Sequence, residues 1–193
     1  MRKLIIAALA ASALATPALA QDKAPFSGVR VEAIAGWDRN QVSGGRSDGI
    51  HYGAGLGYDF RTGGAVLGIE GEAGDSTADK CATSVSNVGD RLCAEAGRDL
   101  YVGGRVGALI GPSTLVYAKA GYANTRLRVA YDANLAGTAG DFTTRGDYDG
   151  LRVGGGIEHA IGRNTFVKAE YRYSNYEQGF EKHQVVGGFG FRF

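Results

Sequence analysis

The feature that most constrains this chain is a period-two pattern. From residue 28 onward, apolar residues recur at every second position in segments of about ten residues. This is the period of a β-strand with one apolar face, and no convincing helical stripe at i, i+3, i+4 and i+7 accompanies it. The pattern therefore predicts an all-β protein. It is clearest in the second segment, where one face carries Ile50, Tyr52, Ala54, Leu56, Tyr58 and Phe60 and the other carries His51, Gly53, Gly55, Gly57 and Asp59.

The alternating segments and their connections also predict a topology. The expected strands are eight, at 28–37, 49–60, 65–74, 99–110, 114–124, 150–161, 165–175 and 182–193, and the alternative for the fifth is a strand that continues toward Val129. The connections alternate between short turns at 61–64, 111–113 and 162–164 and long polar stretches at 38–48, 75–98, 125–149 and 176–181. An even strand number with this alternation is typical of bacterial outer-membrane barrels, whose short turns face the periplasm. The sequence therefore predicts an eight-stranded antiparallel up-and-down transmembrane β-barrel with both termini periplasmic.

The N-terminus has the pattern of a secretory signal. Arg2 and Lys3 precede an apolar run over residues 4–14, and Ala18-Leu19-Ala20 supplies a small-residue cleavage site. The apolar run is shorter than the roughly 20 residues that a membrane helix needs. We therefore expect a signal peptide at 1–20, an outer-membrane β-barrel domain at 21–193 and export to the outer membrane of a Gram-negative cell.

Period two alone does not say which face meets lipid, because a soluble barrel and a membrane barrel differ only in orientation. Glycines and charged residues share one face, which suits the crowded interior of an eight-stranded barrel. Buried charges must be paired or hydrated, and both signs are present for mutual pairing. The predicted interior charge network comprises Arg30, Glu32, Glu70, Glu72, Arg105, Lys119, Arg152, Glu158, Lys168, Glu170, Arg172 and Arg192. The alternative is that these charges form the solvated outer face of a soluble sheet.

Aromatic residues near the strand ends favour the membrane orientation. Rings at both ends of an apolar band are expected of interfacial girdles. The predicted girdle comprises Trp37, Tyr58, Phe60, Tyr122, Tyr171 and Tyr173.

The charge balance bears on the class of partner, and the two cysteines bear on the covalent structure. Without Arg2 and Lys3, the 21 basic residues fall to 19 against 20 acidic residues, which argues against a nucleic-acid partner. Cys81 and Cys93 are the two cysteines of a chain expected to be exported, so a loop-closing disulfide is predicted. A metal site would need further ligands, and no histidine is nearby.

The C-terminus, with Phe189, Phe191 and Phe193 at alternate positions, resembles the terminal strand that the barrel-assembly machinery reads in outer-membrane barrels. The wider chain resembles the OmpA-like outer-membrane β-barrel family of small "porin family" surface proteins. The motifs that carry the resemblance are residues 66–70 (VLGIE), 103–107 (GGRVG), 117–122 (YAKAGY), 154–158 (GGGIE) and 168–173 (KAEYRY).

That resemblance implies roles in envelope integrity, surface contact or limited permeability, with no shared catalytic site. The expected partners are outer-membrane lipid and lipopolysaccharide, the barrel-assembly machinery, and host or surface ligands at the external loops. In full OmpA a peptidoglycan-binding domain follows the barrel; we do not expect one here, and so we do not expect tethering to the envelope by that route.

A search for catalytic or metal chemistry gives no positive signal. His51 and Asp59 share a face but lie about 27 Å apart along a strand. His159 has no serine two residues on, and His183 has the position of an interfacial histidine. The loop acids Asp75, Asp79 and Asp90 lack the spacing of a calcium loop.

We therefore expect a monomeric structural and surface-interaction barrel with a polar, largely plugged interior, no cofactor and no catalysis. One alternative is a narrow passive pore for small solutes. The other is a soluble periplasmic lipid-binding barrel.

Overall fold

The computed structural model describes residues 26–42, 45–83, 90–133 and 140–193, so the predicted signal peptide lies outside the described residues. No helix in these ranges is long and apolar enough to span a bilayer. The elements are β1 (Gly28–Val42), β2 (Gly45–Thr62), β3 (Ala65–Ser76), β4 (Asp79–Thr83), β5 (Arg91–Leu109), β6 (Thr114–Asp132), β7 (Phe142–Ala160), β8 (Thr165–Tyr176), the 3-10 turn η1 (Glu177–Gly179) and β9 (Phe180–Arg192).

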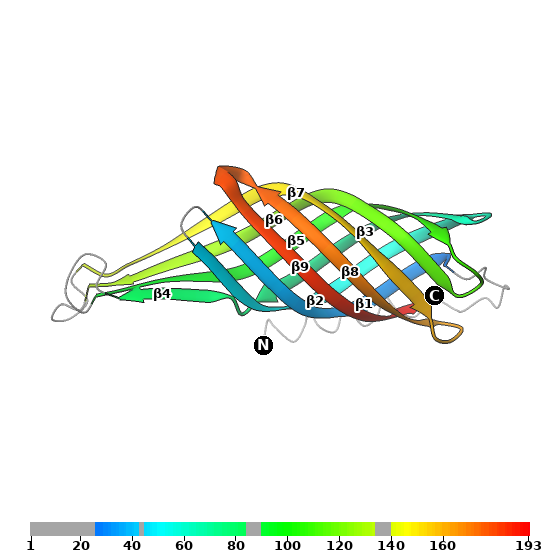
Figure 1. Cartoon of the computed structure of the whole chain (residues 1–193), viewed down its shortest axis with the longest axis horizontal. Coiled ribbons are helices and arrows are strands. Elements are labelled where there is room, and N and C mark those ends of the chain that lie inside the picture. Colours follow the sequence, from blue (N-terminus) through cyan, green and yellow to red (C-terminus); the bar gives the residue numbers. More distant parts are fainter. Residues whose placement is uncertain (1–25, 43–44, 84–89, 134–139) are drawn as a thin grey trace, which may run out of the picture.

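Eight of these strands close into a barrel (Figure 1). Every pair is antiparallel, and the sheet runs in the order β3-β2-β1-β9-β8-β7-β6-β5. Pairing of β3 with β5, from Ala65↔Ala108 to Gly74↔Asp99, completes the ring. The first and last strands are neighbours, in register from Arg30↔Arg192 to Gln41↔Glu181. The predicted eight-stranded antiparallel barrel is confirmed.

The two ends of the barrel differ, as the connection lengths predict. At the short-turn end, β2–β3, β5–β6 and β7–β8 are joined by residues 63–64, 110–113 and 161–164. Gly63 and Gly111 have φ of 60° and 78° there, a backbone conformation that favours glycine. The Phe193 amide also donates to the Val29 carbonyl at this end, at 2.8 Å. The opposite end, here called the hairpin end, carries the long connections.

Apolar side chains point away from the barrel axis and charged side chains point into it. Ile69, Ile110 and Val185 are each more than 60% exposed, whereas Arg30 and Glu158 are fully buried. This is the orientation of a membrane barrel, in which the outward apolar band meets lipid. The soluble-barrel alternative is wrong, because its apolar face would have to point inward.

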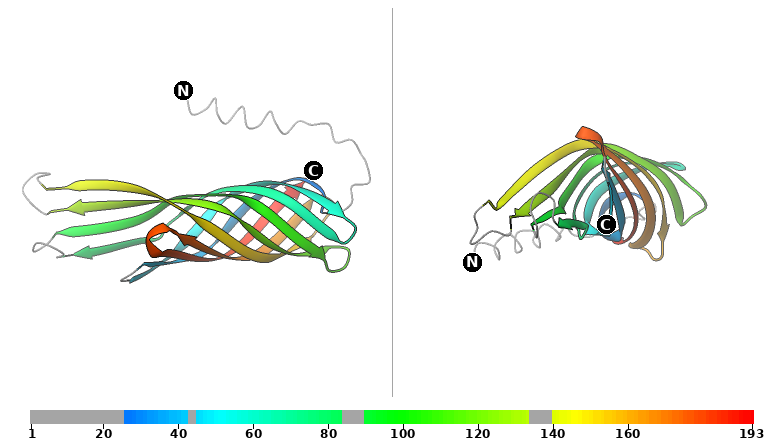
Figure 2. Two further views of the ribbon diagram at one scale, coloured as in Figure 1. Left: turned by 90° about the horizontal axis from the view of Figure 1, so that it is seen from above. Right: turned by 60° about the vertical axis from the view of Figure 1, so that its left-hand side comes forward.

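The strands extend much further beyond the hairpin end than predicted. The sequence predicts irregular connections at 75–98 and 125–149. Instead, much of the first stretch forms the added strand β4 and the start of β5, and much of the second forms the end of β6 and the start of β7. The β4–β5 and β6–β7 hairpins project past the β1–β2 and β8–β9 hairpins (Figure 2). Most of the predicted 38–48 connection is likewise strand, in β1 and β2, and 176–181 includes η1.

Candidate functional site: an ion-paired lumen and a projecting sheet

The lumen contains all twelve predicted interior charges together with four that the prediction left out. The basic set is Arg30, Arg105, Lys119, Arg152, Lys168, Arg172, Lys182 and Arg192. The acidic set is Glu32, Asp38, Asp59, Glu70, Glu72, Asp99, Glu158 and Glu170. Within the described lumen the two signs are therefore equal in number, and every one of these groups has at least one partner of opposite charge within 4 Å.

The first tier of charges lies nearest the short-turn end. Arg105 donates to both carboxylate oxygens of Asp59, with Nε–Oδ1 at 2.8 Å, and to Glu158 at 2.9 Å. Arg192, on the last strand, reaches the same two acids at 2.8 Å each. Arg30 lies 3.4 Å from Asp59 and also contacts Glu70. Strands from both sides of the closing β1–β9 seam therefore share one ion cluster.

The middle tier centres on Lys119. Its ammonium group lies 2.6 Å from Glu70, 2.8 Å from Glu72 and 3.0 Å from Glu170. Arg172 also contacts Glu170, and it lies 2.9 Å from Glu72. These five charges come from β3, β6 and β8, so they cross the full width of the lumen. Lys168 and Glu32 complete this tier, with the lysine Nζ 2.7 Å from a carboxylate oxygen of the glutamate.

The third tier lies toward the hairpin end. Asp99 accepts from Arg152 at 2.7 Å and from Lys182 at 2.8 Å. Lys182 in turn lies 3.3 Å from Asp38. Arg152 donates further to Ser174, at 2.8 Å. This tier holds three of the four charges that the prediction left out.

Inward glycines give the large side chains of the lumen their space. A Cβ atom at Gly103 would lie 2.2 Å from the Tyr101 hydroxyl, and one at Gly156 would lie 2.9 Å from the Tyr117 hydroxyl. The Tyr101 ring lies under the Lys119 ammonium group at 4.5 Å, a cation–π distance. The shared face of glycines and charges that the sequence shows is therefore a packing requirement.

Apolar clusters border the charged tiers at both ends. At the short-turn end, Phe26 packs with Val66, Leu115 and Tyr117, and all four are nearly fully buried. At the hairpin end the cluster consists of Tyr101, Ala123, Tyr176 and Phe180, with Tyr148 packed against it. The sequence does not predict these two clusters. Phe26 precedes the first alternating segment and has a positive φ of 69°, which no strand pattern signals.

The four charges outside the predicted network are Asp38, Asp59, Asp99 and Lys182, and their positions explain why the sequence pattern did not identify them. Asp59 lies on the predicted inward face, although the predicted network does not include it. Asp38 falls in a stretch expected to be a loop, and Asp99 and Lys182 lie at segment ends, where face assignment is least constrained. The spacing along β1 could have identified Asp38. It lies an even number of residues after Arg30 and Glu32, so its side chain falls on the same inward face.

The three histidines lie apart from one another, and none makes a hydrogen bond to a carboxylate of the described residues. His51 is buried in the lumen. His159 Nδ1 lies 3.0 Å from the Thr114 hydroxyl, and His183 Nδ1 lies 2.7 Å from the Tyr171 hydroxyl. In the described part of the chain, no group of three or more His, Cys, Asp or Glu side chains is arranged to hold a metal ion.

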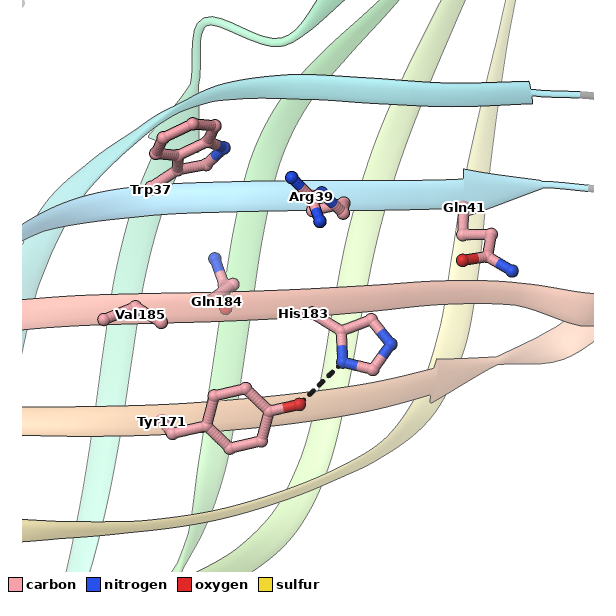
Figure 3. A pocket seen from close by; sticks show the side chains of 7 residues that line it. All are labelled: Trp37, Arg39, Gln41, Tyr171, His183, Gln184 and Val185. Atoms are coloured by element: carbon pink, nitrogen blue, oxygen red, sulfur yellow. Dashed lines mark hydrogen bonds between the residues drawn. The ribbon is translucent and has the colours of Figure 1, made fainter.

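A shallow groove of about 670 Å³ runs along the outer wall at the hairpin end (Figure 3). Trp37 and Arg39 on β1 form one side, Val185 and His183 on β9 lie between, and Tyr171 on β8 forms the other side. The Arg39 guanidinium is already paired with Asp48 at 2.9 Å. Trp37 and Tyr171 are two of the predicted girdle residues, and both are at least half exposed on this wall.

The remaining girdle residues also lie outward. Tyr122 stands at the hairpin end, whereas Tyr58 and Phe60 stand at the short-turn end with Phe191 and Phe193. Tyr173 is the most enclosed of the set and donates to Glu181 at 3.0 Å. Phe189, Phe191 and Phe193 are each about 45% exposed on the outer wall, where the alternating trio faces lipid.

Beyond the barrel, β4 and residues 91–98, 124–132 and 142–149 form what we call the projecting sheet (Figure 2). Cys81 and Cys93 face each other in register and form a disulfide that joins β4 to β5. The predicted disulfide is therefore present. β7 pairs with β8 only from Gly150 onward, so residues 142–149 form a sheet edge.

The outward face changes from apolar to charged between the barrel and the projecting sheet. On β6, the outward positions change from Val116, Ala118, Ala120 and Tyr122 to Asn124, Arg126 and Arg128. The inward positions hold Leu115, Tyr117 and Ala123 beside Lys119 within the barrel, and Leu127, Val129 and Tyr131 beyond it. We therefore expect the lipid-facing part of β6 to end just beyond Tyr122. This change of the outward face also explains why the alternation of apolar residues predicts the strand clearly only as far as residue 124.

The outward face of the projecting sheet carries what we call the arginine patch, formed by Arg98, Arg126, Arg128 and Arg145. Arg126 donates to both oxygens of Asp147, at 2.8 and 3.0 Å, and Arg98 reaches the same carboxylate at 3.5 Å. The hydrogen bond from Arg126 lowers the pKa of the Asp147 carboxyl below its usual range. Arg128 lies 3.9 Å from Glu95.

Comparison with known proteins agrees with this architecture. Residues 6–193 match the model of the outer membrane protein beta-barrel domain. The chain belongs to this family. The sequence resemblance to OmpA-like barrels and the outer-membrane location are thereby confirmed.

Two relatives of this outer-membrane barrel are themselves outer-membrane proteins. The 22 kDa outer membrane protein of Rhizobium leguminosarum bv. viciae is 29% identical over 163 residues, which cover 76% of this chain and 70% of that protein. The 25 kDa outer-membrane immunogenic protein of Brucella ovis is 27% identical over 161 residues, covering 82% and 72% respectively.

Two solved barrels share the fold at low sequence identity. Ail of Yersinia pestis, in complex with the heparin analogue sucrose octasulfate, has a TM-score of 0.60 at 15% identity, covering 87% of this chain and 100% of that one. Neisserial surface protein A has a TM-score of 0.57 at 17% identity, covering 86% and 98%.

Proposed function

We propose that this outer-membrane barrel is a structural and surface-interaction protein with a largely plugged interior and no catalysis. The observation that supports the proposal is the set of ion pairs that cross the lumen. Three tiers of ion pairs occupy it from Arg192 and Asp59 to Lys182 and Asp38, and apolar clusters border it at both ends. A solute crossing the barrel would have to separate these groups.

The physical cost of disturbing this interior is high. Breaking a buried pair by removing one partner typically costs about 3–5 kcal/mol, because the remaining charge stays desolvated. Lys119 is close to three carboxylates at once, so displacing it would leave several such groups without their cation. The ion pairs therefore connect most of the strands across the interior of the barrel and stabilise it.

The surface-interaction half of the proposal rests on the hairpin end. The projecting sheet extends strands well past the membrane boundary, with one apolar face and one charged face. A protein with the same fold is known in complex with a heparin analogue, and a relative is described as immunogenic. We propose that the hairpin end faces the medium and carries the ligand contacts, that both termini are periplasmic, and that the protein is a monomer.

Lipid and biogenesis partners complete the proposal. The outward apolar band would contact outer-membrane lipid, including lipopolysaccharide in the outer leaflet. The trio Phe189, Phe191 and Phe193 would be read by the barrel-assembly machinery, and the aromatic girdle would sit at the two interfaces.

Planar-bilayer conductance tests the plugged interior. The protein is refolded in detergent, shown to shift in gel mobility on boiling, and inserted into a bilayer. No discrete current steps are expected from the wild-type chain. Reproducible small steps would overturn the plugged interior and support the narrow-pore alternative.

The narrow-pore alternative has one observation in its favour. Near the hairpin end of the lumen, both side-chain polar atoms of Asn40 and of Gln184 are buried without a hydrogen-bond partner among the described residues, as is His51 Nδ1. Buried polar groups of this kind usually bind water. A hydrated upper chamber is thus compatible with either function, and the conductance experiment separates them.

A further inference from the structure

The Cys81–Cys93 disulfide lies on the outward face of the projecting sheet, at its edge. Cys93 is directly opposite Ala130 of β6, whose outward positions are the even-numbered ones. Cys81 is exposed and Cys93 is half-buried. β4 is the last strand of the sheet and, among the described residues, pairs with β5 alone (Figure 1). A small molecule at the hairpin end can therefore reach the disulfide.

Arg91 distinguishes the two sulfur atoms of this disulfide. Its Nη2 donates a hydrogen bond to Cys81 Sγ at 3.5 Å. Two acids, Asp79 and Glu95, lie opposite each other on the other side of the disulfide in the β4–β5 register. Asp79 is two residues from Cys81 and Glu95 is two residues from Cys93, so the acids favour neither sulfur. The contact with Arg91 belongs to Cys81.

This contact has a chemical consequence for thiol–disulfide exchange. In that reaction a thiolate attacks one sulfur of a disulfide, and the other sulfur leaves as a thiolate. Exchange is faster when the leaving thiolate is more stable, and a neighbouring arginine stabilises a thiolate. Arg91 therefore favours Cys81 as the sulfur that leaves and Cys93 as the sulfur that is attacked.

We propose that the Cys81–Cys93 disulfide is a reactive site that exchanges with low-molecular-weight thiols in the medium. The inference rests on the proposed outward orientation of the hairpin end and adds a chemical reaction to it. In the first step, the external thiolate forms a bond to Cys93 Sγ. The bond between the two cysteines breaks, and its electron pair goes to Cys81 Sγ beside Arg91.

A second external thiol completes the reaction. Its thiolate attacks the external sulfur of the mixed disulfide, and Cys93 leaves as a thiolate that takes up a proton. Two external thiols are thereby oxidised to one external disulfide, and the protein disulfide is reduced to two cysteines. The electrons therefore balance without any further oxidant or reductant.

Reduction alters the edge of the projecting sheet. β4 has only five residues, and the disulfide joins the central pair of its ladder with β5. Without the covalent bond, that short ladder alone holds β4 in place. Departure of β4 would leave the backbone of β5 unpaired from Arg91 to Glu95. The exchange thus changes the surface that the hairpin end presents to the medium.

Trapping the mixed disulfide tests the direction of attack. The refolded, detergent-solubilised chain is incubated with reduced glutathione at neutral pH, and free thiols are blocked with iodoacetamide at successive times. Mass spectrometry of the digested protein then locates each modification. We expect glutathione on Cys93 and the alkyl group on Cys81 of the same molecules. Glutathione found mainly on Cys81 would overturn the proposal.

The rate of the first step tests the role of Arg91. We expect Arg91→Gln to slow formation of the mixed disulfide by about threefold to tenfold, and Arg91→Lys to keep most of the rate, because lysine retains the cation. Arg128→Gln is the matched control, since Arg128 is an outward arginine of the same sheet but lies against Glu95, at 3.9 Å. Its rate should equal that of the wild type.

The sign of the change separates this role from a merely structural one. If Arg91 only held the hairpin together, its removal would loosen β4 and speed the exchange. Faster or unchanged exchange in Arg91→Gln would therefore overturn the proposal. After boiling in detergent, all variants should react at one rate. Because the reaction is measured in detergent, a negative result would leave the plugged interior and the orientation of the barrel to be judged separately.

Discussion

Arg105 donates to both carboxylate oxygens of Asp59 across the short-turn end of the lumen, joining β5 to β2 within a fully enclosed cluster. β2 and β5 are not neighbours in the sheet, since β3 lies between them. The pair therefore fixes the distance between two walls, which backbone pairing alone does not do.

Replacing Asp59 tests the interior network directly. Asp59→Asn would leave Arg105, Arg192 and Arg30 without their shared carboxylate, so we expect the free energy of unfolding to fall by about 3–5 kcal/mol. Urea titration in lipid vesicles measures the change. The control is Asp48→Asn, which breaks an ion pair with both side chains about half exposed. It should cost less than about 1 kcal/mol, and equal effects of the two variants would contradict the prediction.

Glu158→Gln probes the same cluster from another strand. Glu158 accepts from Arg105 at 2.9 Å and from Arg192 at 2.8 Å. The neutral amide has the same shape but carries no charge to offset these cations, so the thermal unfolding midpoint should fall and refolding yield should drop. A variant that refolds and melts like the wild type would show that the ion pairs do not brace the barrel.

Glycine positions give a prediction about packing. A Cβ atom at inward Gly121 would lie 2.2 Å from the Val102 carbonyl oxygen, whereas one at outward Gly104 would meet its nearest atom at 3.6 Å. Gly121→Ala should therefore reduce the yield of the heat-modifiable barrel, and Gly104→Ala should leave it unchanged. The gel shift measures both. Loss of the barrel in Gly104→Ala would contradict the assignment of these faces.

The disulfide is expected to stabilise the projecting sheet and not the barrel. Cys81 and Cys93 join β4 to β5 beyond the region where β3 closes the ring. Reduction should lower the local opening free energy by about 2–3 kcal/mol and speed proteolysis within residues 75–98. The boiling-dependent gel shift should persist. If reduction abolished the gel shift instead, the barrel would depend on the disulfide.

The C-terminal aromatic trio gives a prediction that separates biogenesis from stability. Phe193→Ala should reduce the amount of barrel in the outer membrane of cells, while refolding in vitro changes little, because the ring is nearly half exposed on the lipid face. Phe60→Ala removes another outward ring at the short-turn end and is the matched control. Equal cellular loss in both variants would refute an assembly-signal role.

The sequence was most informative where one face met lipid and the other was crowded. There the alternation correctly placed Arg105 and Lys119 inside and Leu67 and Val185 outside. It did not reveal which charges meet, because partners such as Asp59 and Arg105 lie on different strands and depend on the stagger of the closed ring.

Past the membrane boundary, the alternation of apolar residues no longer predicts the strands, and the physical reason is different. Tyr131 and Phe142 stack with ring centroids 5.3 Å apart on the inward side of the projecting sheet, where lipid no longer selects the outward face. The strands remain paired there, but the alternation of outward apolar residues that predicts them in the membrane-spanning part is absent. Phe26 is a third case, since a single residue before the first strand gives no periodic signal.

The hydrogen bond between the Phe193 amide and the Val29 carbonyl makes the two described ends of the chain neighbours at the short-turn end. The long hairpins lie at the far end of the same barrel (Figure 1). A peptide inserted in a hairpin and a peptide appended after Phe193 therefore emerge on opposite sides of the bilayer. The fold thus offers two attachment sites for added peptides, one in each of the compartments that the membrane separates.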